Sequence, residues 1–301
     1  MVYLLFFYSR IISSYNTFKI ITATVLRILS NPIANVIQKK LTSKYGSFFV
    51  NSITYAGLSF LTLPFILNIN FINLPKIIWI YGIAGGLLGA LGNAFLVKAL
   101  SLGDLSILGP INAYKPIVAM CFGLFLLKET PTIIGILAIG LIIFGSYFIF
   151  DTVEEKFSIK LLNRKDIRYR FFALFFTALE AIMIKQVIVL SDITTSFIFW
   201  CVFGFIFSII FMFLKNEKLT KLDKKASIQF LGLILMFGIM QITTNYVFNH
   251  MNISYALALF QLSSIINVLF GYRFFKEKHI IKKLIGTTIM ITGAIIIILT
   301  T

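Results

Sequence analysis

Long apolar segments, separated by short polar ones, recur along the whole chain of 301 residues. Most are close to the 20 or so residues that an α-helix needs to cross about 30 Å of hydrocarbon. They do not alternate polar and apolar positions as barrel strands do, and a membrane span must satisfy its own backbone hydrogen bonds. The pattern predicts ten transmembrane helices, over residues 18–38, 46–67, 76–98, 104–127, 131–150, 170–190, 194–214, 227–249, 253–275 and 281–300.

The composition supports an all-α integral membrane protein. Hydrophobic residues make up 59% of the chain and charged residues 13%, whereas soluble domains have about 45–50% and about 25%. Cys121 and Cys201 lie in apolar segments and indicate neither a disulfide framework nor a metal site. The predicted spans contain no His cluster, Ser/His/Asp set or metal-ligand spacing. We therefore expect no enzyme activity, no metal and no cofactor.

An internal repeat divides the chain into two sets of five helices. A shift of 148 positions aligns Ser106 with Ser254, the pair Lys128-Glu129 with Lys276-Glu277, and Gly145 with Gly293. Because five is odd, the second set must enter the membrane from the opposite side, as in the inverted repeats of secondary transporters. We interpret Lys276-Glu277 only as turn residues that mark the repeat. The predicted units are a tail over 1–17, a first repeat over 18–150, a charged linker over 151–169 and a second repeat over 170–301.

The first unit contains the stretch KALSLGDLSILGPINAYKPIVAM, with Ser106 and Pro110, followed by Glu129 at a turn and a glycine-spaced last helix. The second unit has the same outline, with Ser254, Gly271 and Glu277 at its corresponding positions. Together the two units resemble the EamA-type family of the drug/metabolite transporter superfamily. The resemblance implies ten helices, a central cavity and transport of small metabolites by alternating access.

Three charged residues lie near the middle of predicted spans: Lys115, Arg27 and Glu180. A charge at the bilayer centre costs about 2.5–3.5 kcal/mol on insertion scales, and such residues usually face a cavity or a partner. Lys115 is about twelve residues from either end of its span, too deep for its side chain to reach the interface about 15 Å away. We expect it either to face substrate in a water-filled cavity or to pair with Glu180 and lock the repeats together.

Neutral polar residues near these charges indicate the same cavity. Arg27 belongs to a stripe of polar positions spaced three and four apart along the first helix, which places them on one helical face. Lys115 follows Asn112 and Tyr114, between two prolines that bend the span, Pro110 and Pro116. We interpret the glycine face of residues 82–92 mainly as a packing surface. The candidate substrate-binding residues are Lys115, Arg27, Glu180, Asn112, Asn31, Asn93, Tyr114, Gln241, Asn245 and Gln261. Of these, Asn245 and Gln261 could equally form interhelical hydrogen bonds.

The net charge of +16 comes mostly from one side of the predicted bundle. That side carries Lys39, Lys40, Lys44 and the segments 151–169 and 215–226. The positive-inside rule places it in the cytoplasm with both termini outside, whereas the family resemblance implies both termini inside. We favour the charge bias. The positive charge then faces anionic lipid, and it does not indicate binding of nucleic acid.

These features predict a multi-pass secondary transporter of the cytoplasmic membrane that moves a small anionic or zwitterionic metabolite. Its partners would be the small-molecule substrate, the lipid bilayer, and either a proton or a counter-substrate; the protein would be a monomer or a homodimer. Two alternatives stay open. One is an exporter of hydrophobic or cationic compounds, in which Glu180 is the main binding group and aromatic helices form the cavity. The other is a lipid flippase.

Overall fold

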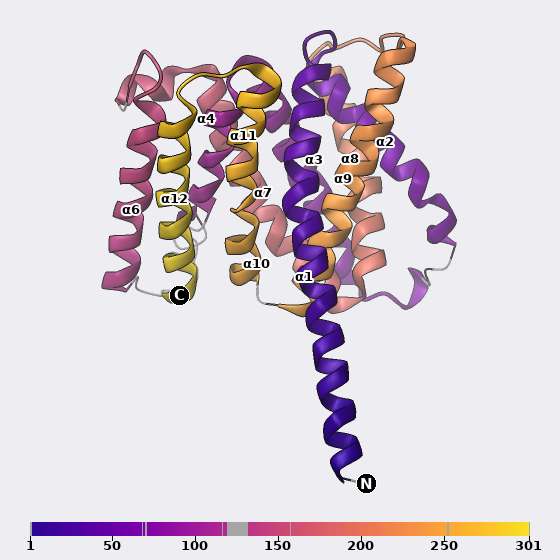
Figure 1. Cartoon of the computed structure of the whole chain (residues 1–301). Coiled ribbons are helices and arrows are strands. Elements are labelled where there is room, and N and C mark those ends of the chain that lie inside the picture. The colour runs from indigo at the N-terminus through magenta and orange to yellow at the C-terminus, as the bar shows by residue number, and fades with distance from the viewer. Residues whose placement is uncertain are drawn as a thin grey trace.

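Every element in the described part of the chain is helical, which confirms the predicted fold class (Figure 1). The computed structural model describes residues 2–67, 69, 71–115, 117–118, 132–156, 158–251 and 253–300. The elements, in order, are α1 (Val2–Leu41), α2 (Ser47–Ile66), η1 (Phe71–Asn73), α3 (Lys76–Leu102), α4 (Leu105–Leu108), η2 (Pro110–Tyr114), α6 (Ile133–Phe150), η4 (Ile159–Asn163), α7 (Lys165–Leu190), α8 (Ile193–Leu214), α9 (Lys224–His250), α10 (Ile253–Phe260), α11 (Ser263–Phe275) and α12 (Ile280–Thr300).

The outer surface of the bundle is apolar. Large side chains such as Phe60, Leu137 and Ile281 are 71%, 69% and 72% exposed, as expected for a surface that faces lipid rather than water. Among the described residues, 7 helices are long and apolar enough to cross a membrane. They are Thr17–Leu41, Ser47–Ile66, Lys76–Leu102, Ile133–Phe150, Lys165–Leu190, Ile193–Leu214 and Lys224–His250.

The two halves of the bundle run in opposite directions. In Figure 1, α1 rises toward the face that carries the loops 42–46, 151–164, 215–223 and 276–279, whereas α7, its counterpart in the second half, descends from that face. We call this the basic face; both ends of the chain lie at the opposite, terminal face. The equivalent helices α3 and α9 both have 27 residues, and their first residues are 148 positions apart. Helix α3 packs on α7, and α9 packs on α1.

Helices α6 and α12, the last of each half, form a close pair at one edge of the molecule (Figure 1). A Cβ on Gly145 would lie 2.8 Å from the carbonyl oxygen of Gly286, and a Cβ on Gly293 would lie 2.8 Å from that of Ala138. The 148-residue shift carries Ala138 to Gly286 and Gly145 to Gly293, so each half makes the same contact with the other. Small residues allow the two backbones to approach this closely.

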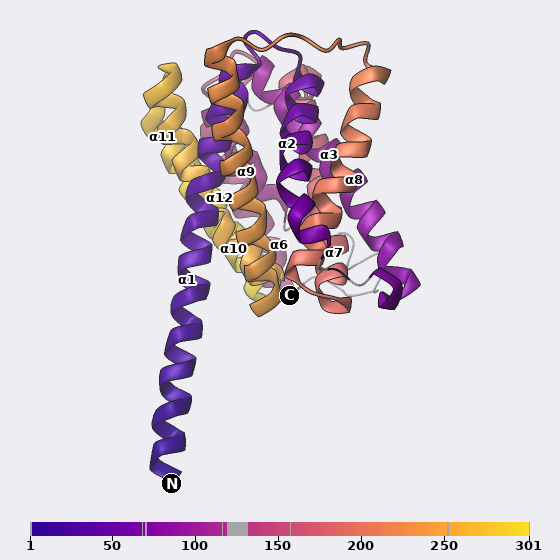
Figure 2. The ribbon, with the colours of Figure 1, turned by 90° about the vertical axis from the view of Figure 1, so that its right-hand side faces the viewer.

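The predicted first span, residues 18–38, agrees with the apolar span Thr17–Leu41, but the helix itself starts earlier in the chain. Helix α1 begins at Val2 rather than at residue 18 and has 40 residues, so the expected tail over 1–17 is helical from residue 2. The chain has no glycine or proline before Pro32 that would interrupt the helix. At 1.5 Å per residue the helix is about 60 Å long, and its first part projects beyond the bundle in both views (Figures 1 and 2).

The fourth and ninth predicted spans are not continuous α-helices. The fourth changes at Gly109 from α4 to the 3-10 helix η2, which begins at Pro110; proline has no N–H to continue the α-helical ladder. The ninth is divided into α10 and α11 at residues 261–262. Pro116 and residues 119–131, which belong to the predicted fourth and fifth spans, lie outside the described residues. Discontinuous helices near the midplane are typical of substrate sites in transporters.

Candidate functional site

A cavity of about 110 Å³ lies between the two halves of the bundle. Its lining comes from α1, α2 and α3, from Gly109, Asn112 and Lys115 of the broken fourth span, and from α7 to α11. Seven of the ten candidate residues line it: Arg27, Asn31, Asn93, Asn112, Lys115, Glu180 and Gln241. Residues that lie far apart in the sequence are thus brought to one site.

Lys115 stands at the C-terminal end of η2 and lines the cavity. Among the described residues, no carboxylate lies within the 4.0 Å of its ammonium group that defines an ion pair. The expected alternative, in which Lys115 and Glu180 lock the repeats together, is therefore not formed. The charge of Lys115 is left for solvent or a bound anion.

Arg27 is held in place but keeps one free donor. Its Nε donates to Thr244 Oγ1 at 2.8 Å, and its guanidinium carbon lies 4.7 Å from the centre of the Phe260 ring. Its Nη1 is buried without a hydrogen-bond partner, as is the hydroxyl of Tyr55, and both residues line the cavity. Buried polar groups without a partner are rare in folded proteins, so these two are candidate ligand-binding groups.

The Glu180 carboxylate accepts a hydrogen bond from Nε1 of Trp200. Gly89 of α3 faces this pair: a Cβ there would lie 2.6 Å from Glu180 Oε1 and 2.6 Å from Trp200 Nε1. The absence of a side chain at position 89 therefore leaves the space that the carboxylate and the indole occupy. Trp200 was not among the predicted site residues.

Arg170 is a second lining residue that the sequence reasoning missed. Its Nε donates to the carbonyl oxygen of Leu108 at 2.7 Å, and its Nη2 donates to Asn112 Oδ1 at 3.1 Å. The guanidinium thus supports the broken fourth span. With Arg170 included, the lining contains three cationic side chains and one carboxylate, a larger positive surplus than the sequence indicated.

Amide side chains join the two halves around the cavity. Asn112 Nδ2 donates to Gln261 Oε1 at 3.1 Å, which connects the two broken spans. Asn35 of α1 donates to Asn267 of α11, also at 3.1 Å. Asn93, in contrast, is bonded within the first half, where it donates to Asn51 Oδ1 at 2.6 Å. These bonds set the positions of the broken spans relative to α1.

Three candidate residues do not line the cavity. Tyr114 points toward α6, where its hydroxyl donates to Ser146 Oγ at 2.8 Å. Gln261 forms the link to Asn112 just described. Asn245 Oδ1 accepts from Gln241 at 3.0 Å within α9, whereas its Nδ2 is buried without a hydrogen-bond partner. For Gln261 the structure thus favours interhelical bonding over ligand binding.

The glycines of α3 mainly serve packing, as the sequence suggested. A Cβ on Gly82 would lie 2.2 Å from the Phe199 ring, and a Cβ on Gly86 would lie 2.3 Å from Phe203 Cβ, both on α8. Gly92 faces Thr177 of α7 at 2.4 Å in the same way. Only at Gly89 does the close approach also shape the cavity wall.

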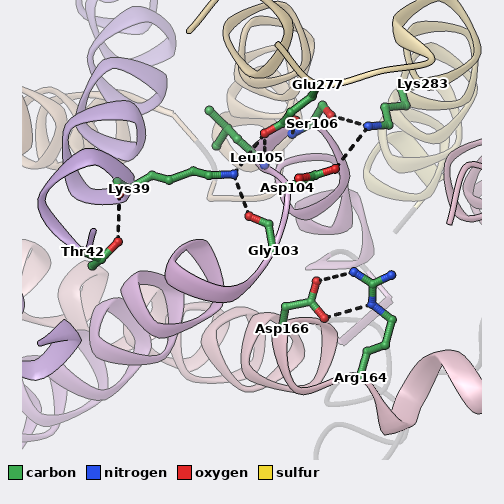
Figure 3. Close-up of polar contacts among 10 residues, drawn as sticks. All are labelled: Lys39, Thr42, Gly103, Asp104, Leu105, Ser106, Arg164, Asp166, Glu277 and Lys283. Carbon is green, nitrogen blue, oxygen red and sulfur yellow. Dashed lines mark hydrogen bonds and ion pairs between the residues drawn. The ribbon is translucent and has the colours of Figure 1, made fainter. Parts of the chain in front are cut away.

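A polar network closes the basic face of the bundle beside the N-terminus of α4 (Figure 3). The Glu277 carboxylate accepts hydrogen bonds from the backbone N–H groups of Leu105 and Ser106, both at 2.8 Å. Lys39 donates to Glu277 Oε1 at 3.1 Å and to the Gly103 carbonyl oxygen at 2.7 Å. Glu277 is only 7% exposed, so it is more than the turn residue that the sequence suggested.

The same network continues to α12. Lys283 donates to Ser106 Oγ at 2.7 Å and lies 3.8 Å from Asp104 Oδ2. Burial alone would raise the pKa of Glu277, but the charge of Lys39 and the hydrogen bonds from Ser106 outweigh it, so the pKa lies below its usual value. The network therefore holds the ends of α1, α3 and α4 against α11 and α12 of the other half.

Comparisons with known proteins agree with this architecture. The sequence matches the EamA-like transporter family over residues 18–151 and again over 167–299. The fold is similar to that of a protein of known crystal structure, with a TM-score of 0.65 and 15% sequence identity, over 94% of this chain and 96% of that one. A search of curated protein sequences gives no match. The chain belongs to the EamA-like transporter family of the drug/metabolite transporter superfamily, and it is a multi-pass membrane transporter rather than an enzyme.

Proposed function

We propose that the protein is a secondary carrier for a small anionic or zwitterionic metabolite. The observation that carries this proposal is the charge of the cavity lining, which contains the cations Arg27, Lys115 and Arg170 and a single carboxylate, Glu180. Three positive side chains in one cavity between apolar helices favour an anion, because each unneutralised charge inside the membrane is costly. The cytoplasmic membrane as location and the repeat boundaries 18–150 and 170–301 belong to the same proposal.

The free donors indicate how an anion would bind. Lys115 would contact a carboxylate or phosphate as a point charge. The unpartnered Nη1 of Arg27 and hydroxyl of Tyr55 would donate to its other oxygens. In a zwitterionic substrate the amine would lie toward Glu180. Rocking of one half against the other would then expose the cavity to each side in turn.

The basic face supports an anionic substrate as well. A hollow of about 750 Å³ opens there between α1, α3 and α9. Its lining includes four lysines and one aspartate: Lys39, Lys40, Lys44, Lys225 and Asp223. Positively charged clefts raise the local concentration of anions, so this hollow would serve as the vestibule on that side.

A second candidate function is export of lipophilic cations, which is favoured by the aromatic side chains in the lining. These are Tyr55, Trp200, Phe237, Phe248 and Phe260. In that case Glu180 would bind the cation, and loss of Lys115 would leave transport unchanged or improve it, because a repelling charge is removed.

The test compares Lys115→Ala and Lys115→Arg with wild type in purified form and in vesicles. The probes are succinate, inorganic phosphate, L-alanine and putrescine, which cover a dianion, a phosphate, a zwitterion and a dication. We expect an anion or the zwitterion, but not putrescine, to raise the melting temperature of wild type by mass action and to be transported. Lys115→Ala should reduce that affinity by about 10-fold to 100-fold, the range of a lost charged hydrogen bond of about 1.5–3 kcal/mol.

Lys98→Ala is the matched control, since Lys98 also belongs to a spanning helix but does not line the cavity. Lys115→Arg should keep part of the affinity, because it preserves the charge. If binding of every anion and of L-alanine survived Lys115→Ala unchanged, or if only putrescine bound, the proposed substrate class would be wrong.

A further inference from the structure

Glu180 is a buried carboxylate with an unusual set of neighbours. It is 8% exposed, and its hydrogen bond from Trp200 is neutral rather than charged. No cationic group among the described residues lies within the 4.0 Å that defines an ion pair. A carboxylate that served only as a structural counter-ion would be expected in direct contact with a cation.

The ionisable groups that face this part of the cavity come from several helices. They are Arg27 on α1, Tyr55 on α2, Lys115 at the end of η2 and Arg170 on α7 itself. The thiol of Cys201, which follows Trp200 on α8, is buried and does not line the cavity. The lining residues of α3, α9, α10 and α11 are uncharged. Among the described lining residues, Glu180 is therefore the one carboxylate that could bind a proton.

Proton binding and anion binding at such a site are linked. A bound anion neutralises part of the positive surplus, so it favours the neutral, protonated form of a nearby carboxylate. By reciprocity, the proton increases the affinity for the anion by the same factor. The indole of Trp200 can remain hydrogen-bonded throughout, because one oxygen of a protonated carboxyl group still accepts.

We propose that Glu180 is the proton-binding site of this carrier and that the proton binds together with the anion, so that the two are transported in the same direction. This inference rests on the proposed function. Each transport cycle would take up one proton on the Glu180 carboxylate with the anion on one side and release both on the other. A substrate whose amine occupied Glu180 would instead displace the proton.

The chain offers a direct optical test, because it has 2 tryptophans. Trp79 lies outside the cavity lining and packs at a tilt against Phe199, with ring centres 5.0 Å apart. Trp79→Phe therefore leaves Trp200 as the only indole, in direct contact with Glu180. In purified Trp79→Phe protein we expect the fluorescence to change with pH in a single titration, and Trp79→Phe/Glu180→Gln should lack that titration.

Ligand dependence then tests the coupling. Succinate or inorganic phosphate should move the titration midpoint to higher pH, and a move of one pH unit corresponds to about tenfold tighter anion binding to the protonated form. Putrescine should not move the midpoint upward. In vesicles, an inward proton gradient (acidic outside) should drive uptake of the same anion by wild type and by Lys98→Ala. Glu180→Gln should lose this response.

Two results would overturn the inference: a fluorescence titration that persists in the Glu180→Gln protein, or a midpoint that stays constant or falls when the anion binds. Failure of the proposed function gives a different result, because no anion or L-alanine would then stabilise the wild-type protein against heat. In that case the proton coupling is rejected as well.

Discussion

The four charged side chains that line the cavity are each stabilised by a different kind of partner. Arg170 donates hydrogen bonds to a backbone carbonyl and to an amide oxygen. Arg27 donates to a hydroxyl and lies over an aromatic ring. Glu180 has an indole donor. The side chain of Lys115 instead lines the cavity, where solvent or an anion can contact it. Among these charged side chains, the free donors are thus at Lys115 and at one nitrogen of Arg27.

At the residue scale, Gly89→Ala tests the contact between Glu180 and Trp200. The added methyl group would lie 2.6 Å from both polar atoms, so the pair must separate or α3 must move away from α7 and α8. We expect a loss of about 1–3 kcal/mol in unfolding free energy, the usual cost of overpacking. Thermal unfolding of the purified protein measures it.

Gly85→Ala on the same helix is the control for Gly89→Ala, since its nearest contact would be an ordinary 3.6 Å to Met183 Cβ. Alanine has the better helix propensity by about 1 kcal/mol, so this variant should be neutral or slightly stabilised. Equal destabilisation by both variants would contradict the role assigned to Gly89.

Site residues could be predicted from the sequence where a charged residue occurs within an apolar segment. Lys115, Arg27 and Glu180 do so, and all three line the cavity. Arg170 does not, because it lies at the edge of the charged linker, where a solvated arginine is the simpler reading. Trp200 was missed because a tryptophan in an apolar helix gives no sign that its N–H has a carboxylate partner.

At the element scale, the broken fourth span depends on a side chain from the other half of the protein. The four-residue helix α4 leaves backbone N–H groups without helical partners at its start, and Glu277 accepts from two of them. Gly271 makes this possible, because a Cβ there would lie 2.4 Å from Glu277 Oε2. The position of α4 is thus set by the turn between α11 and α12.

Glu277→Gln tests this dependence. The variant loses the charge that pairs with Lys39, and we expect a loss on the order of 1–3 kcal/mol in unfolding free energy, because buried donors lose part of their acceptor. Glu154→Gln removes the same charge from an exposed residue and should have little effect. Thermal unfolding of both variants near neutral pH makes the comparison.

The depressed pKa of Glu277 also gives a pH dependence. The contribution of this carboxylate to stability is complete above its unfolded-state pKa and is lost as the pH falls through the lower, folded-state pKa. Wild type should therefore lose stability relative to Glu277→Gln on the acid side of the usual glutamate range. A constant difference between the two proteins across that range would contradict the role of the carboxylate.

The helices could largely be predicted, because the length of an apolar segment directly indicates whether it can form a transmembrane helix. The interruption of the fourth span was also indicated, by Pro110. The interruption between Phe260 and Ser263 was not, because neither glycine nor proline occurs there. At this interruption Gln261 accepts a tertiary hydrogen bond from Asn112, which no local sequence pattern reveals.

At the scale of the whole molecule, the cavity and the close helix pair are separate regions. No described residue of α6 or α12 lines the cavity, while every other long helix contributes to it. Under the proposed function, we therefore expect the α6–α12 pair to stay fixed as the remaining helices rearrange around the substrate. This division suits a mechanism in which each half moves about a shared, glycine-packed edge.

The pairing of α6 with α12, of α3 with α7 and of α1 with α9 has a consequence for biosynthesis. Each of these pairs takes one helix from each half, so the first half emerges from the ribosome with its partner surfaces still missing. We expect neither residues 1–157 nor residues 158–301 to persist alone in cells, whereas the two fragments made together should assemble. Recovery of the untagged fragment with a tagged partner would measure this; two fragments that were each stable and did not associate would contradict it. We therefore expect the duplicated units to be halves of one folding unit, whose packing is complete only when the last helix has been synthesised.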